Sequence, residues 1–341
     1  MFLLAQNTSA LGRLFGWFVN IIFEFVYSIT PAYSLFITVI LFTLIVKLLL
    51  LPLMIKQQKS AKATQKIQPQ IQAIQDKYKN KNDQESQQAM ATELQAVYSQ
   101  NGASPFTGCL LSFIQIPIIY ALFGVCKQIH IHISKIGAIY DKLADIVSKV
   151  PNYEELLSNL ATAKKLTGKQ TFDFSIMDDV KNLFITLSNN DWQALIGDIS
   201  SHVDVNAINE ILVKKNEIET AFGINLINRP SIHSLSVILP LITVLVTYLS
   251  IRKSLKVSDD MDETSKKMIK NMSGFMYFMI ISIFFTSLSL PAALSIYWTI
   301  NSLFSILQSK LLKNMFKEDK DNKNDKGKKD YVDVKKVKEV K

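Results

Sequence analysis

The stretch LFITVILFTLIVKLLLLPLMI, residues 35–55, contains a single charged residue, Lys47. A helix of about 20 mostly apolar residues crosses the hydrocarbon core of a bilayer. The stretch therefore predicts a transmembrane helix and places the chain among membrane proteins. Lys47 lies just past the middle of that helix, where a cation costs roughly 2.5–3.5 kcal/mol on insertion scales. A reason for its presence has to come from the rest of the sequence.

Four more segments have the length and composition of membrane spans. They are 106–126, 234–251, 274–290 and about 292–312, with a break at Pro291 that predicts a tight hairpin between the last two. The segment 11–29 mixes aromatic residues with Arg13, Asn20 and Glu24, a pattern typical of a helix that lies in the membrane interface. Whether this segment lies flat or crosses is left open by the sequence.

The distribution of basic residues predicts the orientation. The segments 56–105, 252–270 and 310–341 each carry more Lys and Arg than Asp and Glu, whereas 127–233 does not. Cytoplasmic loops carry the Lys and Arg excess, so we expect the N-terminus outside and the C-terminus in the cytoplasm. The predicted order is an outside interfacial helix at 1–30, spans at 31–55, 105–127, 234–251, 273–290 and 291–312, a cytoplasmic helical hairpin at 56–104, an extracytoplasmic loop at 128–233, a cytoplasmic loop at 252–272 and a disordered basic tail at 313–341.

The two large polar segments are predicted to be helical. In 56–104 two narrow apolar stripes indicate a hairpin whose second arm begins at Asp83 as N-cap. In the outer loop, amphipathic patches at 138–150, 153–166 and 204–221 predict short helices, and Trp192 and Phe222 are expected to anchor a small core.

The sequence offers no arrangement for covalent catalysis, so we expect no enzyme and no cofactor. The four histidines lack the spacing of a metal site, and Cys109 and Cys126 stand too far apart along one helix for a disulfide. The clear spans contain no Asp or Glu, which argues against most ion-coupled transporters.

The spans do contain amides, hydroxyls and one cation. An amide in hydrocarbon needs a partner and faces the helix bundle or a wet cavity. Lys47 is too deep for its side chain to reach water fully by extending along the helix, although partial snorkelling stays an alternative. We therefore predict a hydrophilic groove open to the cytoplasm, and the residues expected to line it are Lys47, Thr43, Gln115, Tyr297, Trp298 and Asn301.

Three stretches together resemble the YidC/Oxa/Alb family of membrane protein insertases, in its short five-span bacterial form. They are residues 46–53 (VKLLLLPL) with 56–60 and 67–71, residues 104–109 (SPFTGC) with 114–118, and residues 290–298 (LPAALSIYW) with Asn301 and Gln308. The resemblance covers about 11–128 and 222–312. The groove charge of this family is usually an arginine, and its match here is Lys47.

The resemblance implies an all-α integral membrane protein with five transmembrane helices around a positively charged groove. It implies an insertase and chaperone of the bacterial plasma membrane that takes up nascent membrane proteins without nucleotide hydrolysis. Membrane lipids, the ribosome and the Sec translocon are the further partners expected, with no DNA, and the chain is expected to be a monomer. The basic tail would bind anionic lipid or ribosomal RNA, or is a solvated tail that helps set topology. The alternative function is a lipid scramblase or small-solute transporter that uses the same polar groove.

Overall fold

The computed structural model describes residues 10–81, 83–103, 107–164, 166, 172–254 and 263–311. The tail at 313–341 lies outside these residues, as do residues 104–106 of the predicted second span. Helices dominate the described part. In order they are α1 (Ala10–Ile29), α2 (Ser34–Tyr78), α3 (Gln84–Gln100), α4 (Thr107–Lys127), α5 (Ile129–His132), α6 (Ser134–Val147), α7 (Tyr153–Ala163), α8 (Met177–Thr186), α9 (Asn189–Ile199), α10 (Val205–Glu219), the 3-10 turn η1 (Leu235–Val237), α11 (Ile238–Ser254) and α12 (Glu263–Ser289).

The long apolar helices agree with a membrane protein. Within the described residues, three helical segments are long and apolar enough to cross a bilayer, Gly12–Ile29, Ser34–Ala61 and Leu235–Arg252, and shorter apolar helices cover Ile114–Lys127 and Tyr277–Ser289. The predicted break near Pro291 is confirmed, because α12 ends at Ser289 and a further helix occupies 292–311. The prediction of five spans stays a prediction, since the described residues give three such segments.

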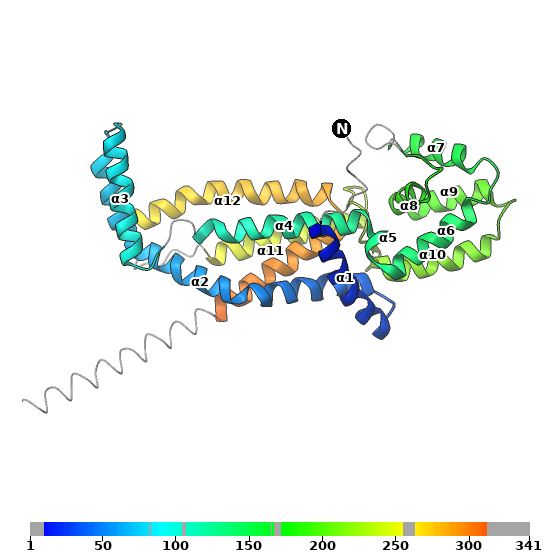
Figure 1. Cartoon of the computed structure of the whole chain (residues 1–341), viewed down its shortest axis with the longest axis horizontal. Coiled ribbons are helices and arrows are strands. Elements are labelled where there is room, and N and C mark those ends of the chain that lie inside the picture. The colour runs from blue at the N-terminus through cyan, green and yellow to red at the C-terminus, as the bar shows by residue number, and fades with distance from the viewer. Residues whose placement is uncertain are drawn as a thin grey trace, which may run out of the picture. The chain divides into compact units, whose positions relative to one another are not determined.

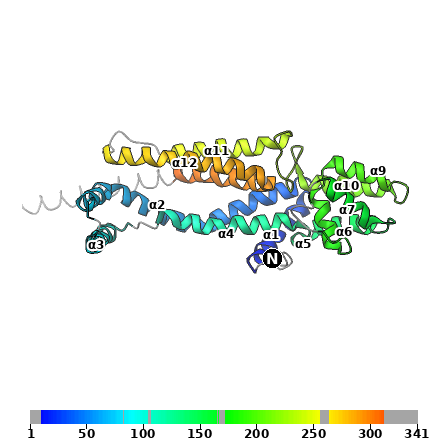
Figure 2. The same ribbon diagram turned by 90° about the horizontal axis from the view of Figure 1, so that it is seen from above.

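The chain divides into two compact units. The first comprises residues up to Val46, Cys109–Val244 and Met279–Thr299, and the second comprises Lys47–Gly108, Leu245–Phe278 and the chain from Ile300 onward. In the first unit α1 runs across the beginning of α2 and not alongside it (Figures 1 and 2). The interfacial helix at 11–29 stays a prediction, since α1 also has the length and composition to cross a bilayer.

The second unit contains the helical hairpin. The first predicted span and the first arm of the hairpin form one continuous helix, since α2 passes through Pro52 and Pro69. Asp83 is confirmed as the N-cap of α3, because its side chain accepts a hydrogen bond from the Ser86 backbone N–H at 2.8 Å. Glu93 of α3 accepts hydrogen bonds from Lys77 Nζ at 2.6 Å and from Tyr78 Oη at 2.9 Å. These contacts join the two arms.

The outer loop folds into a group of short helices, α6 to α10, within the first unit (Figure 1). The patches at 138–150, 153–166 and 204–221 correspond to α6, α7 and α10, while α8 and α9 were not predicted. Trp192 is buried and meets the Phe184 ring at 4.8 Å between centroids, as expected of a core residue. The prediction for Phe222 is wrong: it is 71% exposed. Phe222 occupies the tip of a hairpin, and a two-residue turn has no interior in which to bury a ring.

The outer helices are tied to the apolar helices of the first unit by polar contacts. The strands β1 (Thr220–Ala221) and β2 (Ile224–Asn225) pair antiparallel after α10. The backbone N–H groups of Ala292 and Ala293 donate to the carbonyls of Asn228 and Leu226 at 2.9 and 2.8 Å. The first N–H groups of a helix have no partner within it, so the segment after β2 caps the helix at 292–311.

Candidate functional site

Lys47 is a covered cation in an apolar helix. It belongs to α2 and is 7% exposed, whereas the next two residues, Leu48 and Leu49, are 57% and 69% exposed. One face of α2 is therefore apolar and open, as a face against lipid would be, and the lysine lies on another. Among the described residues, the ion pairs found do not include Lys47. Its charge is thus removed from the surface with no carboxylate of the described part of the chain paired to it.

Thr43 lies one turn before Lys47 on α2 and is fully buried. Its hydroxyl donates to the carbonyl of Val39 at 2.6 Å. Hydroxyls commonly bond back to their own helix in this way. The structure therefore accounts for Thr43 without a groove, and its role as a lining residue stays a prediction.

Gln115 and Tyr297 are brought together in the first unit. The side-chain amide of Gln115, on α4, donates a hydrogen bond to the hydroxyl of Tyr297, on the helix at 292–311. Tyr297 is 1% exposed and Gln115 is half-buried. The sequence predicted that an amide in a span needs a partner, and Tyr297 is that partner for Gln115. Trp298 follows Tyr297 and is half-buried.

Hydroxyl groups join α11 to the same helix. In the first unit, Thr243 Oγ1 lies 2.9 Å from Thr299 Oγ1 and donates to the Ser295 carbonyl at 3.0 Å. In the second unit, Thr247 Oγ1 lies 3.1 Å from Ser302 Oγ. The six residues predicted to line the groove do not include these hydroxyls. The spacing of four residues between Thr243 and Thr247 was the available signal, because it puts both on one face of a helix.

Several polar atoms on the helix at 292–311 are covered and make no hydrogen bond within the described residues. They are Ser295 Oγ, Asn301 Oδ1 and Gln308 Nε2. Asn301 and Gln308 are seven residues apart and so share a helix face. Buried polar groups are nearly always satisfied by protein, water or a bound molecule. This face therefore carries polar groups that the described residues leave without a partner.

The described residues contain no group of three His, Cys, Asp or Glu side chains that could hold a metal ion. The candidate functional groups are polar side chains in each unit and, in the second unit, the Lys47 cation. The charged, amide and hydroxyl side chains lie on helices whose other faces are apolar, an arrangement that would let polar groups be handled at membrane depth.

The helical fold and its long apolar helices define the class as an all-α, membrane-embedded protein. The model of the family described as 60Kd inner membrane protein matches residues 25–320, and the chain belongs to this family. The family resemblance inferred from the sequence is confirmed.

Individual relatives carry the name of an insertase. The chain is 26% identical over 310 residues to a protein from Listeria monocytogenes named membrane protein insertase YidC 1, covering 89% of this chain and 75% of the relative. It is 43% identical over 96 residues to membrane protein insertase YidC of Enterococcus faecalis, covering 28% of this chain and 34% of the relative. It is 47% identical over 89 residues to the protein of that name from Clostridium perfringens, covering 26% of this chain and 35% of the relative.

Proposed function

We propose that the chain is a membrane protein insertase and chaperone of the bacterial plasma membrane. It receives the polar part of a nascent membrane protein in a positively charged hydrophilic groove and releases the apolar helices into the bilayer, without nucleotide hydrolysis. Membership of the family supports this function, and the names of the relatives describe insertases and not catalytic enzymes. Nascent membrane proteins and lipids are its partners.

The observation that carries the proposal is the covered position of Lys47 in an apolar helix. A buried charge without a paired carboxylate is costly. A substrate segment with acidic or polar side chains would offset that cost when it enters, and it would do so only while it occupies the groove. The groove residues proposed with Lys47 are Thr43, Gln115, Tyr297, Trp298 and Asn301.

The driving force for release is the transfer of apolar surface into lipid. A wet groove shortens the apolar distance that a polar segment must cross, and an apolar helix gains free energy when it leaves water for hydrocarbon. The proposed architecture has five spans, at 31–55, 105–127, 234–251, 273–290 and 291–312. Its N-terminus is outside and its C-terminus is in the cytoplasm, as the Lys and Arg excess of the cytoplasmic segments predicts.

The helical hairpin and the basic tail are proposed to act in the cytoplasm. The exposed faces of α2 and α3 would make the first contact with a substrate, and the basic tail and cytoplasmic loops would meet the ribosome through phosphate neutralisation. Cooperation with the Sec translocon and action as a monomer belong to the same proposal.

The test is reconstitution of the purified chain into liposomes with a single-span substrate that carries an acidic outer tail. Insertion is scored by protection of that tail from added protease. We expect protection that requires the chain and needs no nucleotide. The alternative, a lipid scramblase or small-solute transporter, predicts movement of labelled lipid or solute in liposomes without substrate. Such movement without tail protection would overturn the insertase proposal.

A further inference from the structure

The turn between β1 and β2 holds an aromatic residue where turn chemistry disfavours one. Two loop residues, Phe222 and Gly223, join the paired residues Ala221 and Ile224. Both have positive φ, 52° at Phe222 and 76° at Gly223. Hairpin turns with two positive φ values favour Asn-Gly or Asp-Gly, since a bulky side chain is strained there. Phe222 therefore has a backbone conformation that is unfavourable for a residue with a bulky side chain.

A second aromatic residue, which contacts Phe222, also has an unfavourable positive φ. Tyr33 has φ 60° and directly precedes the first residue of α2. Its ring stacks on that of Phe222, with centroids 5.7 Å apart, and Phe36 meets Phe222 edge-on at 5.5 Å. The Tyr33 backbone N–H donates to the Glu217 carbonyl at 3.0 Å. Strained backbones persist where the surroundings hold them and are concentrated at functional positions.

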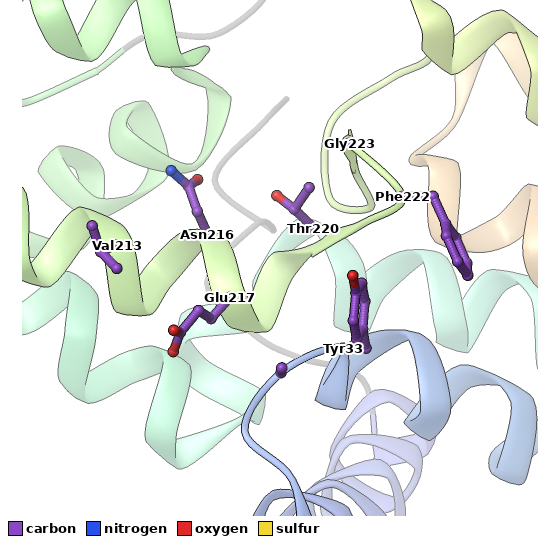
Figure 3. Close-up of a pocket in the computed structure, with 8 residues that line it drawn as sticks. Tyr33, Val213, Asn216, Glu217, Thr220, Phe222 and Gly223 are labelled. Carbon is purple, nitrogen blue, oxygen red and sulfur yellow. The ribbon is translucent and has the colours of Figure 1, made fainter.

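These aromatic side chains are exposed and not buried. Phe222 is 71% exposed and Tyr33 46% exposed, and they border an open pocket of about 390 Å³ (Figure 3). Leu235 is 62% exposed and lies beside the turn, since a Cβ added at Gly223 would stand 3.9 Å from its Cδ2. We call this group, the aromatic residues Tyr33 and Phe222 together with the aliphatic Leu235, the aromatic collar.

The aromatic collar lies at the N-terminal ends of two candidate membrane spans. The candidate span Ser34–Ala61 starts one residue after Tyr33, and the candidate span Leu235–Arg252 starts at Leu235 itself. Two polar residues of the pocket, Asn216 and Glu217, lie on α10 (Figure 3). Apolar groups therefore gather at the ends of the spans, and polar groups gather on the outer helix.

We propose that the aromatic collar sits at the boundary between head groups and acyl chains of the adjacent leaflet and anchors the outer helices to the bilayer surface. Aromatic side chains are enriched at this boundary, where the ring leaves water and any polar end stays hydrated. The occupant of the collar is lipid, because the collar is continuous with the ends of two spans. The left-handed turn presents the Phe222 ring on the outside, where it meets the membrane and not a protein core.

The test places a nitroxide at the turn of the full chain. In a Cys109→Ala, Cys126→Ala background, spin labels are attached to Phe222→Cys and, as matched control, to Ile176→Cys. Ile176 is also an exposed apolar residue of the outer helices, 40% exposed, just before α8. The protein is reconstituted in vesicles of phosphatidylethanolamine and phosphatidylglycerol. Accessibility of each label to oxygen and to a water-soluble nickel chelate is measured by power saturation.

We expect the label at position 222 to be about threefold less accessible to the nickel chelate than the label at 176, and more accessible to oxygen. Equal nickel accessibility at the two positions would overturn the proposal. Should Phe222→Cys fail to fold, Leu235→Cys reports on the same boundary with the same expectation. Protection of position 222 that arises only after a single-span substrate is added would assign the collar to the substrate instead. This test involves no insertion activity, so its outcome is separate from that of the proposed function.

Discussion

Lys215 and Glu219 form a buried ion pair in α10, with Nζ and Oε2 2.9 Å apart and each side chain 2% exposed. Two further groups satisfy the carboxylate: Tyr140 Oη donates to Glu219 Oε1 at 2.9 Å, and Asn225 Nδ2 donates to Oε2 at 3.3 Å. The Lys215 ammonium also lies 5.8 Å from the Tyr140 ring centroid. This network joins α6, α10 and β2, and so connects the outer helices to the hairpin that holds Phe222 of the aromatic collar.

Removing one charge of this pair is expected to destabilise the outer helices strongly. Glu219→Gln would leave the Lys215 cation buried without its counter-charge, at a cost of about 3–5 kcal/mol. The matched control is Asp145→Asn, which breaks the pair that Asp145 forms with Lys149 at 2.6 Å, also four residues apart but 63% and 70% exposed. That change should cost at most about 0.5 kcal/mol. Hydrogen exchange of α6 and α10 in the full chain measures both, and equal effects would contradict the assigned role of burial.

Lys47 is expected to act through its charge. Lys47→Ala and Lys47→Glu should reduce tail protection in the reconstituted insertion assay, with the larger loss for Glu because it repels an acidic tail. Lys47→Arg should retain most of the activity, since arginine keeps the positive charge. The control is Lys142→Glu, a charge reversal at an exposed position of α6. Wild-type insertion by both Lys47→Ala and Lys47→Glu would refute the groove-charge mechanism.

The outer helices should lose stability in mild acid because of His130. Burial, and after it the nearby Lys181 cation, lower the pKa of His130 to about 4, against the smaller opposite effects of Asp178 and Asp141. The imidazole is then neutral in the folded chain, whereas the unfolded chain binds a proton near pH 6.5. Its contribution is complete above pH 6.5 and is lost as the pH falls toward 4, by an amount on the order of 3 kcal/mol.

The experiment follows thermal unfolding of the outer helices between pH 7 and pH 4. His130→Gln should flatten the pH dependence in this window, because the titrating group is gone. His202→Gln, at an exposed position, should leave the dependence unchanged. If His130→Gln keeps the full acid sensitivity, the buried imidazole is not its source.

The sequence predicts the membrane helices better than the outer helices, for physical reasons. A span such as 35–55 is nearly uniform in polarity, so its length alone identifies it. The need of Gln115 for a partner also follows from its position in hydrocarbon. The identity of the partner does not, because Tyr297 is reached only through the packing of two helices far apart in sequence.

Phe222 shows why composition misleads in the outer region. A phenylalanine in a polar segment is often a core residue, and on that rule the sequence predicts a buried Phe222. The competing signal was the dipeptide Phe222-Gly223 between short β-prone runs, which fits a two-residue turn only poorly because Phe is unfavourable at its first position. Tertiary contacts with Tyr33 and Phe36 hold the turn. Those contacts are not visible in a local pattern.

The hydrogen bond between Gln115 and Tyr297 should couple α4 to the helix at 292–311. Tyr297→Phe and Gln115→Leu each leave one polar group without its partner, whereas the double variant removes both groups. We therefore expect the double variant to lose less stability than the sum of the single variants. The coupling should be about 0.6 kcal/mol and at most about 1.7 kcal/mol, as for hydrogen bonds between membrane helices. Thermal unfolding in one detergent measures the stability of the four proteins.

The control is Tyr120→Phe, which removes a hydroxyl from a tyrosine of α4 that is 69% exposed and should change the stability little. Strict additivity of Tyr297→Phe and Gln115→Leu would mean that the two side chains do not interact in the membrane.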